Sequence, residues 1–130
     1  MTTIPKKYIS RKDEITKDFL NLAEQHVNDV LHNRVDRMFH SSDFAKLLFI
    51  HPRHLTNTIK LTTGKSPCDV MEEKVMTESQ RMLRETDKSV AEIAASFFYF
   101  EPSNFIKFFK GMCGLTPLQY RKSMSAVNAE

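Results

Sequence analysis

The strongest constraint on how this chain can fold is a pattern that occurs twice along it. A shift of 50 residues aligns Pro52 with Pro102, Leu55 with Phe105, Ile59 with Phe109, Lys60 with Lys110, Gly64 with Gly114, Ser66 with Thr116 and Pro67 with Pro117. Upstream the shift is 49, and it aligns Phe44 with Ile93, Ala45 with Ala94 and Leu48 with Phe97. A change of one residue between two matching helical blocks indicates a turn that is one residue longer in the second copy.

Each copy predicts a helix, a tight turn and a second helix. Pro52 and Pro102 suit the first turn of a helix, where a backbone N–H is not needed. Gly64 and Gly114 predict helix ends, because glycine adopts the left-handed conformation at no steric cost. Two helices joined at this spacing form a helix-turn-helix unit, whose second helix lies in the major groove of DNA. A duplicated scaffold hairpin is the alternative, but two copies are too few for a solenoid.

The rest of the chain predicts helices that support both units. Apolar spacing indicates an amphipathic helix over 13–31 and a second long helix, between the two units, over 68–84. The predicted fold is all-α: an N-terminal helix plus two helix-turn-helix units joined by a long linker helix. The expected boundaries are an arm or linker remnant (1–12), the packing helix with the first unit and linker helix (13–84), the second unit (85–122) and a tail (123–130). A continuous helix, at ~1.5 Å per residue, would space two readers for successive major grooves, roughly 34 Å apart.

The charge of the chain changes sign along it. Residues 44–67 hold four basic residues and no acidic one, residues 68–95 hold four basic and seven acidic residues, and residues 96–122 hold four basic and one acidic residue. The pattern favours contact with a polyanion at two separate places, although an unevenly charged solvated surface would look the same.

The sequence has no features of a membrane protein, a secreted protein, a metal-binding protein or an enzyme. No run approaches the eighteen or so apolar residues of a membrane span, and no signal peptide is visible, so a cytoplasmic location is expected. Cys68 and Cys113 have neither zinc-site nor disulfide-framework spacing, and His51 and His54 lack a third ligand. We therefore expect no metal, no cofactor, no enzyme activity and no small-molecule pocket. The chain is read either as a complete small regulator or as the C-terminal part of a longer one.

The stretches "ETDKSVAEIA" (85–94) and "GLTPLQYR" (114–121), with Phe105 and Phe109-Lys110 between them, resemble the DNA-binding domain of AraC/XylS-type bacterial transcription regulators. The resemblance covers about 39–122. It implies two helix-turn-helix units joined by a helix, binding to double-stranded promoter DNA, and RNA polymerase as a further candidate partner.

The chain departs from the family pattern mainly in the second unit. Phe98 stands where the turn usually has glycine, Phe100 where a small capping residue is usual, and Phe108 where polar residues are common; Val75 replaces a usually basic residue. Either Phe98 adopts a strained left-handed conformation, or the longer turn takes another path and Phe98 joins a local aromatic cluster. The apolar sequence "FFYF" favours the cluster. The second unit is thus the less typical reader.

The predicted contacts with DNA lie on the second helix of each unit. Arginine bonds guanine, asparagine bonds adenine, and a threonine methyl packs on thymine. The expected base contacts are Arg53, Thr56 and Asn57 in the first unit and Ser103, Asn104 and Lys107 in the second; the expected phosphate contacts are His54, Lys60, Lys110 and Arg121. For each of them, ordinary solvated surface is the alternative. For the chain as a whole, the alternative is a protein-interaction module on the same fold that presents the aromatic-rich stretch 96–109.

Overall fold

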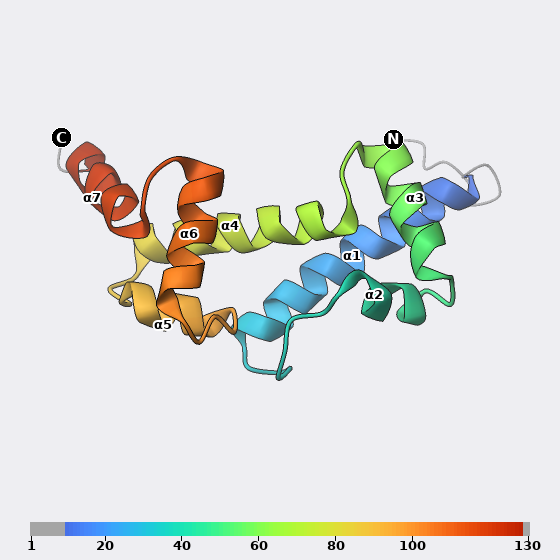
Figure 1. Ribbon diagram of the computed structural model, residues 1–130, viewed down its shortest axis with the longest axis horizontal. Helices are drawn as coiled ribbons and strands as arrows, with labels where there is room; N and C mark the ends of the chain where they lie inside the picture. Colours follow the sequence, from blue (N-terminus) through green and yellow to red (C-terminus); the bar gives the residue numbers. More distant parts are fainter. Residues whose placement is uncertain (1–9, 129–130) are drawn as a thin grey trace, which may run out of the picture. The chain divides into compact units, whose positions relative to one another are not determined.

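The computed structural model describes residues 10–128, which form seven helices and no strand (Figure 1). In chain order the helices are α1 (Arg11–Leu31), α2 (Ser41–Leu47), α3 (Pro52–Thr63), α4 (Pro67–Glu85), α5 (Val90–Ser96), α6 (Pro102–Cys113) and α7 (Pro117–Asn128). The all-α fold class is confirmed. Within the described range no helix is long and apolar enough to span a membrane.

The helices divide into two compact units. Unit 1 combines residues up to Asp29 with Phe39–Glu72, and unit 2 combines Val30–Met38 with the chain from Glu73 onward. Unit 1 therefore holds most of α1, with α2, α3 and the first residues of α4, while unit 2 holds the rest of α4 with α5, α6 and α7. The sequence placed the boundary at 84/85, at the end of α4, whereas the compact units divide within this helix.

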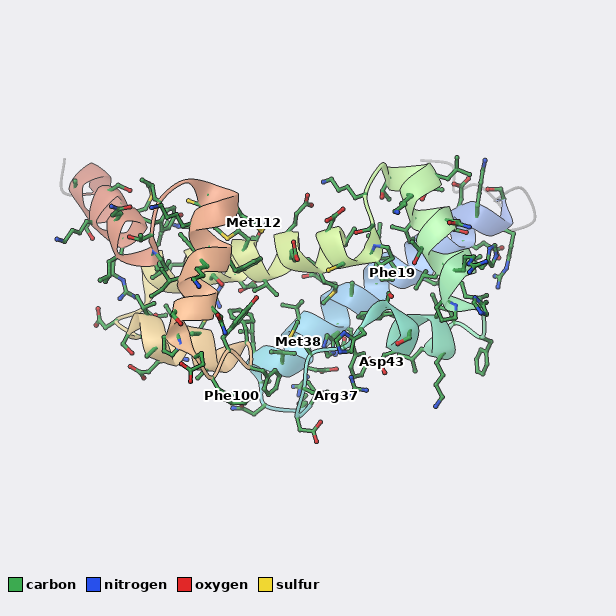
Figure 2. All side chains as sticks on the ribbon, viewed as in Figure 1. Phe19, Arg37, Met38, Asp43, Phe100 and Met112 are labelled. Atoms are coloured by element: carbon green, nitrogen blue, oxygen red, sulfur yellow. The ribbon has the colours of Figure 1, made fainter. Side chains whose placement is uncertain are left out.

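Unit 1 is built on α1. Ile15, Phe19 and Ala23 of α1 are buried, as their helical spacing predicts, and Phe19 meets the ring of Phe44 edge-on at 5.4 Å between centroids (Figure 2 labels Phe19). The buried His26 stacks on Phe39 at 4.0 Å and accepts a hydrogen bond of 3.0 Å at Nε2 from the Phe39 backbone N–H. This bond fixes the chain immediately before α2.

Unit 2 has a continuous core. The buried residues of that core come from the end of α1, from α4, α5, α6 and α7: Val30, Val75, Met76, Met82, Leu83, Ile93, Ala94, Phe97, Phe105, Phe109 and Tyr120. Phe105 and Phe109 are four residues apart on α6, and Phe109 meets Tyr120 of α7 edge-on at 5.7 Å. The apolar positions that the repeat aligned are thus the positions that form the core.

Capping residues begin the helices of both units. Ser66 and Asp69 exchange hydrogen bonds at the start of α4, Ser89 and Glu92 at the start of α5, and Thr116 and Gln119 at the start of α7. In each pair the side chains satisfy backbone N–H groups that the helix leaves without a partner. The three pairs share one spacing, in which the second residue follows the first by three positions.

The turns within the two units have the same backbone hydrogen bonds. Ile50 donates to the carbonyl of Ala45, and Tyr99 donates to the carbonyl of Ala94, both at 3.0 Å. The residue before each donor is a phenylalanine in the left-handed region, Phe49 with φ 58° and Phe98 with φ 65°. The prediction that the second turn avoids this conformation is wrong. The ring of Phe98 nevertheless packs against the core of unit 2, so the predicted contact with the aromatic cluster is present.

The structure also differs from the prediction near both ends of the given sequence, where helices extend further than expected. Helix α1 begins at Arg11, so the expected arm over 1–12 ends in helix, while residues 1–9 lie outside the described range. Helix α7 runs to Asn128, so most of the expected tail over 123–130 is helical.

The two phenylalanines predict opposite responses to glycine. Phe49 is 95% exposed, so Phe49→Gly removes only a left-handed conformation that costs a residue with a Cβ about 1 kcal/mol, and we expect the free energy of unfolding to rise. Phe98→Gly removes the same cost but also the packing of a half-buried ring, so we expect no rise. Urea unfolding of both variants measures the difference, and equal gains would show that the Phe98 ring contributes nothing.

Candidate nucleic-acid interface

The outward face of α3 is polar and basic. Arg53, Asn57 and Lys60 are exposed and Thr56 is half-buried, and their spacing places all four on one face of the helix. The opposite face is held in the core by Leu55, Thr58 and Ile59, which are all buried. The predicted orientation of this helix is therefore the one observed.

The side chains on this face are available to a ligand. Within the described residues no hydrogen bond or ion pair engages the side chain of Arg53, His54 or Asn57. His54 is exposed in the first turn of α3. His51, in contrast, is the N-cap of this helix: its Nδ1 accepts a hydrogen bond of 3.0 Å from the Arg53 backbone N–H. The His51 cap thus fixes the start of α3, and with it the backbone from which the Arg53 side chain extends.

Helix α3 is also fixed at its other end. The hydroxyls of Thr62 on α3 and Thr16 on α1 are hydrogen-bonded at 2.7 Å. Gly64 ends the helix with φ 77°, and its N–H donates to the carbonyl of Lys60. A helix held at both ends presents its outer side chains in a defined geometry, which recognition of a specific ligand requires.

The charged residues of α3 are basic, and the first acidic residue after them is Asp69, in the first turn of α4. The pKa of Asp69 is lowered, mainly because its carboxylate accepts a hydrogen bond from the Ser66 backbone N–H, with further contributions from the Ser66 hydroxyl and from Lys60 and Lys65. Asp69 therefore stays ionised as the cap of α4. The exposed Lys46, Arg53, Lys60 and Lys65 make the segment 44–67 of unit 1 basic.

The outward face of α6 resembles that of α3, with one aligned polar position replaced by an apolar residue. Ser103, Asn104, Lys107 and Lys110 are all exposed, and no hydrogen bond or ion pair within the described chain engages their side chains. The position that holds Thr56 in α3 holds the half-buried Ile106 here. The first turn lacks a side-chain cap as well, because Glu101 stands at the N-cap without such a bond. Helix α6 thus has an apolar side chain where α3 has a hydroxyl, and its start is not held by a side-chain cap.

Arg121 has a structural position. Its guanidinium donates hydrogen bonds to the backbone carbonyls of Leu83 at 3.0 Å, Thr86 at 3.2 Å and Lys88 at 2.6 Å. It therefore holds the end of α4 and the loop that leads to α5. These bonds engage the guanidinium that the sequence predicted to contact a phosphate, so the position of Arg121 is explained by bonds within the protein.

Unit 1 has an open hollow of about 270 Å³ between the start of α2 and the start of α4, lined in part by Phe44, Pro67, Cys68 and Met71. The expectation that the chain has no small-molecule pocket stays a prediction. The pKa of the Cys68 thiol is raised by partial burial and by the Glu72 carboxylate, which accepts a hydrogen bond from Sγ at 3.6 Å. The thiol therefore stays protonated and is a poor nucleophile.

The aromatic-rich stretch of unit 2 serves mainly the core. Phe97, Phe105 and Phe109 are buried, and Phe98 and Phe108 pack against them. Only Phe100 of this stretch is a strongly exposed ring, at 81%, and it projects from the loop before α6 (Figure 2). The exposed aromatic surface that the protein-interaction alternative requires is thus reduced to one residue.

Comparison with known proteins agrees with this geometry. A model of a family described as a helix-turn-helix domain matches residues 44–123, which include both turns and both outward faces. The chain belongs to the AraC-type helix-turn-helix family. The predicted family, fold and function class, the DNA-binding domain of transcription regulators, are confirmed.

The individual relatives that the chain matches have low sequence identity to it. The chain is 29% identical over 83 residues to the uncharacterised HTH-type transcriptional regulator YisR of Bacillus subtilis, covering 64% of this chain and 29% of that regulator. It spans less than half the length of the other curated relatives it matches.

Two solved structures share the fold. The DNA-binding domain of AdpA, solved in complex with a target DNA, superposes with a TM-score of 0.74 at 18% identity and covers 87% of this chain and 97% of that one. An AraC-type regulator from Chromobacterium violaceum gives a TM-score of 0.72 at 17% identity, with 85% and 92% covered. At these identities the likeness concerns the fold alone.

The two possible roles of Arg121 can be separated with one conservative change. Arg121→Lys keeps the charge but loses the fork that reaches three carbonyls, so we expect a loss of about 2–3 kcal/mol in the free energy of unfolding of unit 2. Hydrogen exchange of the amides in 83–90 would show the loss directly. Lys122→Met is the matched control, since Lys122 is exposed next to it. A variant as stable as the original would show that the three bonds contribute little.

Proposed function

We propose that the chain is a sequence-specific module for double-stranded DNA in which α3 and α6 are the recognition helices. The observation that carries the proposal is the outward face of α3: Arg53, Asn57 and Lys60 point away from a buried face, on a helix capped at both ends. Arg53 and Asn57 have donor patterns that match guanine and adenine in the major groove.

Within this module we assign base contacts to Arg53, Thr56 and Asn57 on α3 and to Ser103, Asn104 and Lys107 on α6. His54, Lys60 and Lys110 are assigned to phosphates, because they flank these residues on exposed surface. The half-buried Ile106 and the missing cap support a smaller contribution from α6. The AdpA domain was solved with its target DNA, which supports the same kind of ligand for a chain of this fold.

The wider proposal concerns the context in which the module acts. Bound to a promoter in the cytoplasm, it would alter the access or activity of RNA polymerase, and it would act through binding, without catalysis. An electrophoretic assay with RNA polymerase on a promoter that carries the selected site tests this part separately from DNA binding.

The first experiment is selection from a random pool of duplexes, followed by titration of the winning site at rising salt. We expect a defined sequence, and an affinity that falls steeply with salt because each phosphate contact releases counterions. A protein-binding module would select no sequence, and its affinity for a protein partner through Phe100 would change little with salt.

Single substitutions on α3 test the assignment of bases and phosphates. Arg53→Ala and Asn57→Ala should each weaken the preferred site by about 1–3 kcal/mol and relax the preference beneath this helix. Lys60→Ala should weaken all duplexes alike and reduce the salt slope by about one unit. If Arg53→Ala left both affinity and preference unchanged, α3 would not be the reader.

Footprinting tests whether both units bind. Two copies of one unit in a single chain follow each other head to tail, so we expect two protected blocks, about one helical turn apart, without a palindrome. Protection of one block alone would mean that α6 does not enter the groove, and a symmetric inverted repeat would point to a two-fold dimer.

A further inference from the structure

An apolar side chain stands on the outer surface of α3. Leu61 is 71% exposed, although Leu55 and Ile59 on the same helix are fully buried. A single exposed leucine is ordinary on a protein surface. The position of Leu61 is informative because it lies on the helix whose exposed face carries the proposed base contacts.

Leu61 continues the row of side chains that starts in the first turn. It follows Asn57 by four residues and His54 by seven, which places all three exposed residues on one stripe of the helix. At ~1.5 Å per residue, Leu61 lies roughly 6 Å beyond Asn57 along the axis, a distance of less than two base-pair steps of ~3.4 Å. A helix that places Asn57 against a base edge therefore brings Leu61 over the neighbouring base pairs.

The second unit shows that the fold does not need this side chain. The residue at the equivalent position of α6 is Gly111, and a Cβ built there meets no atom within 4 Å. The outer surface is thus open at this position in both units. One helix carries a branched apolar group there and the other carries none, so this is a point at which the two readers differ.

We infer that Leu61 packs against the 5-methyl group of a thymine and so adds a base preference at the far end of the site read by α3. In the major groove the methyl group distinguishes thymine from the other bases, and apolar side chains are the groups that recognise it. The assignment rests on the proposed function, since it requires α3 to lie in the groove. The size of the effect follows from removing one methyl group from water, which corresponds to about a four-fold change in affinity.

Replacing single thymines by deoxyuridine removes this methyl group and leaves base pairing intact. Each thymine of the selected site would be replaced in turn, and the affinity of every duplex measured by fluorescence anisotropy for the original chain and for Leu61→Ala. We expect one thymine beneath α3 at which deoxyuridine weakens the original chain about four-fold and leaves Leu61→Ala unaffected. The loss of this difference in the variant identifies the side chain that contacts the methyl group.

Two controls complete the design. Lys60→Ala alters the neighbouring residue in the same helical turn and should retain the four-fold difference at the same thymine, while weakening every duplex. Circular dichroism of Leu61→Ala should be unchanged, because the side chain is largely in water. These variants separate a methyl contact from a general loss of affinity or helix.

The outcomes distinguish this inference from the proposal on which it rests. A site without thymine beneath α3, or a deoxyuridine effect that persists in Leu61→Ala, overturns the role of Leu61 while DNA binding stands. If the original chain selects no duplex at all, the proposed function itself fails, and the exposure of Leu61 then belongs to some other contact.

Discussion

The hydrogen bond from the Ile50 backbone N–H to the Ala45 carbonyl, repeated by Tyr99 and Ala94, sets the path of the chain between the two helices of each unit. It forms because the preceding phenylalanine adopts a left-handed conformation, which ends the first helix and lets the N–H reach the carbonyl five residues earlier. The small Ala45 and Ala94 are fully buried and leave room for the second helix to approach. With the turn fixed, the buried residues of α3 and α6 enter the core, and the polar residues are left on the outside.

The two units share this turn but differ in what surrounds it. In unit 1 the turn phenylalanine is almost entirely exposed, the recognition helix is capped by His51, and Thr62 is bonded to Thr16. In unit 2 the equivalent Phe98 packs against an aromatic core, and α6 begins without a side-chain cap. Unit 1 thus has the better-defined outer face, and unit 2 has the more aromatic core. This difference supports the proposal that α3 supplies most of the sequence preference.

Much of the fold could be predicted because it depends on local or repeated signals. Proline at the start and glycine at the end bound α3 and α6 correctly, and the aligned apolar residues are buried, apart from the half-buried Leu48. The left-handed Phe49 could have been predicted too, since the shift of 49 that aligns Ala45 with Ala94 also aligns Phe49 with Phe98. The exposed face of α3 followed from helical periodicity alone.

Other features depend on contacts that periodicity does not encode. The bonds of Arg121 join residues 33 to 38 positions apart, so a surface arginine in a basic segment gave no sign of them. The role of His51 depends on its rotamer, and the division inside α4 depends on which core each of its turns joins. These features are determined by which side chains meet in the folded protein, and the spacing of residues in a single sequence does not reveal that.

The distribution of these long-range contacts has a consequence for the order in which the protein forms during synthesis. Unit 1 is complete once the chain has passed Glu72, whereas the core of unit 2 includes both Val30 and Tyr120. Domains fold as units, with the N-terminal one first, as the chain emerges. The first recognition helix can therefore be native while the segment that holds Arg121 is still inside the ribosome. Until that arginine emerges, the carbonyls of Leu83, Thr86 and Lys88 lack their donor, so the second reader matures after the first.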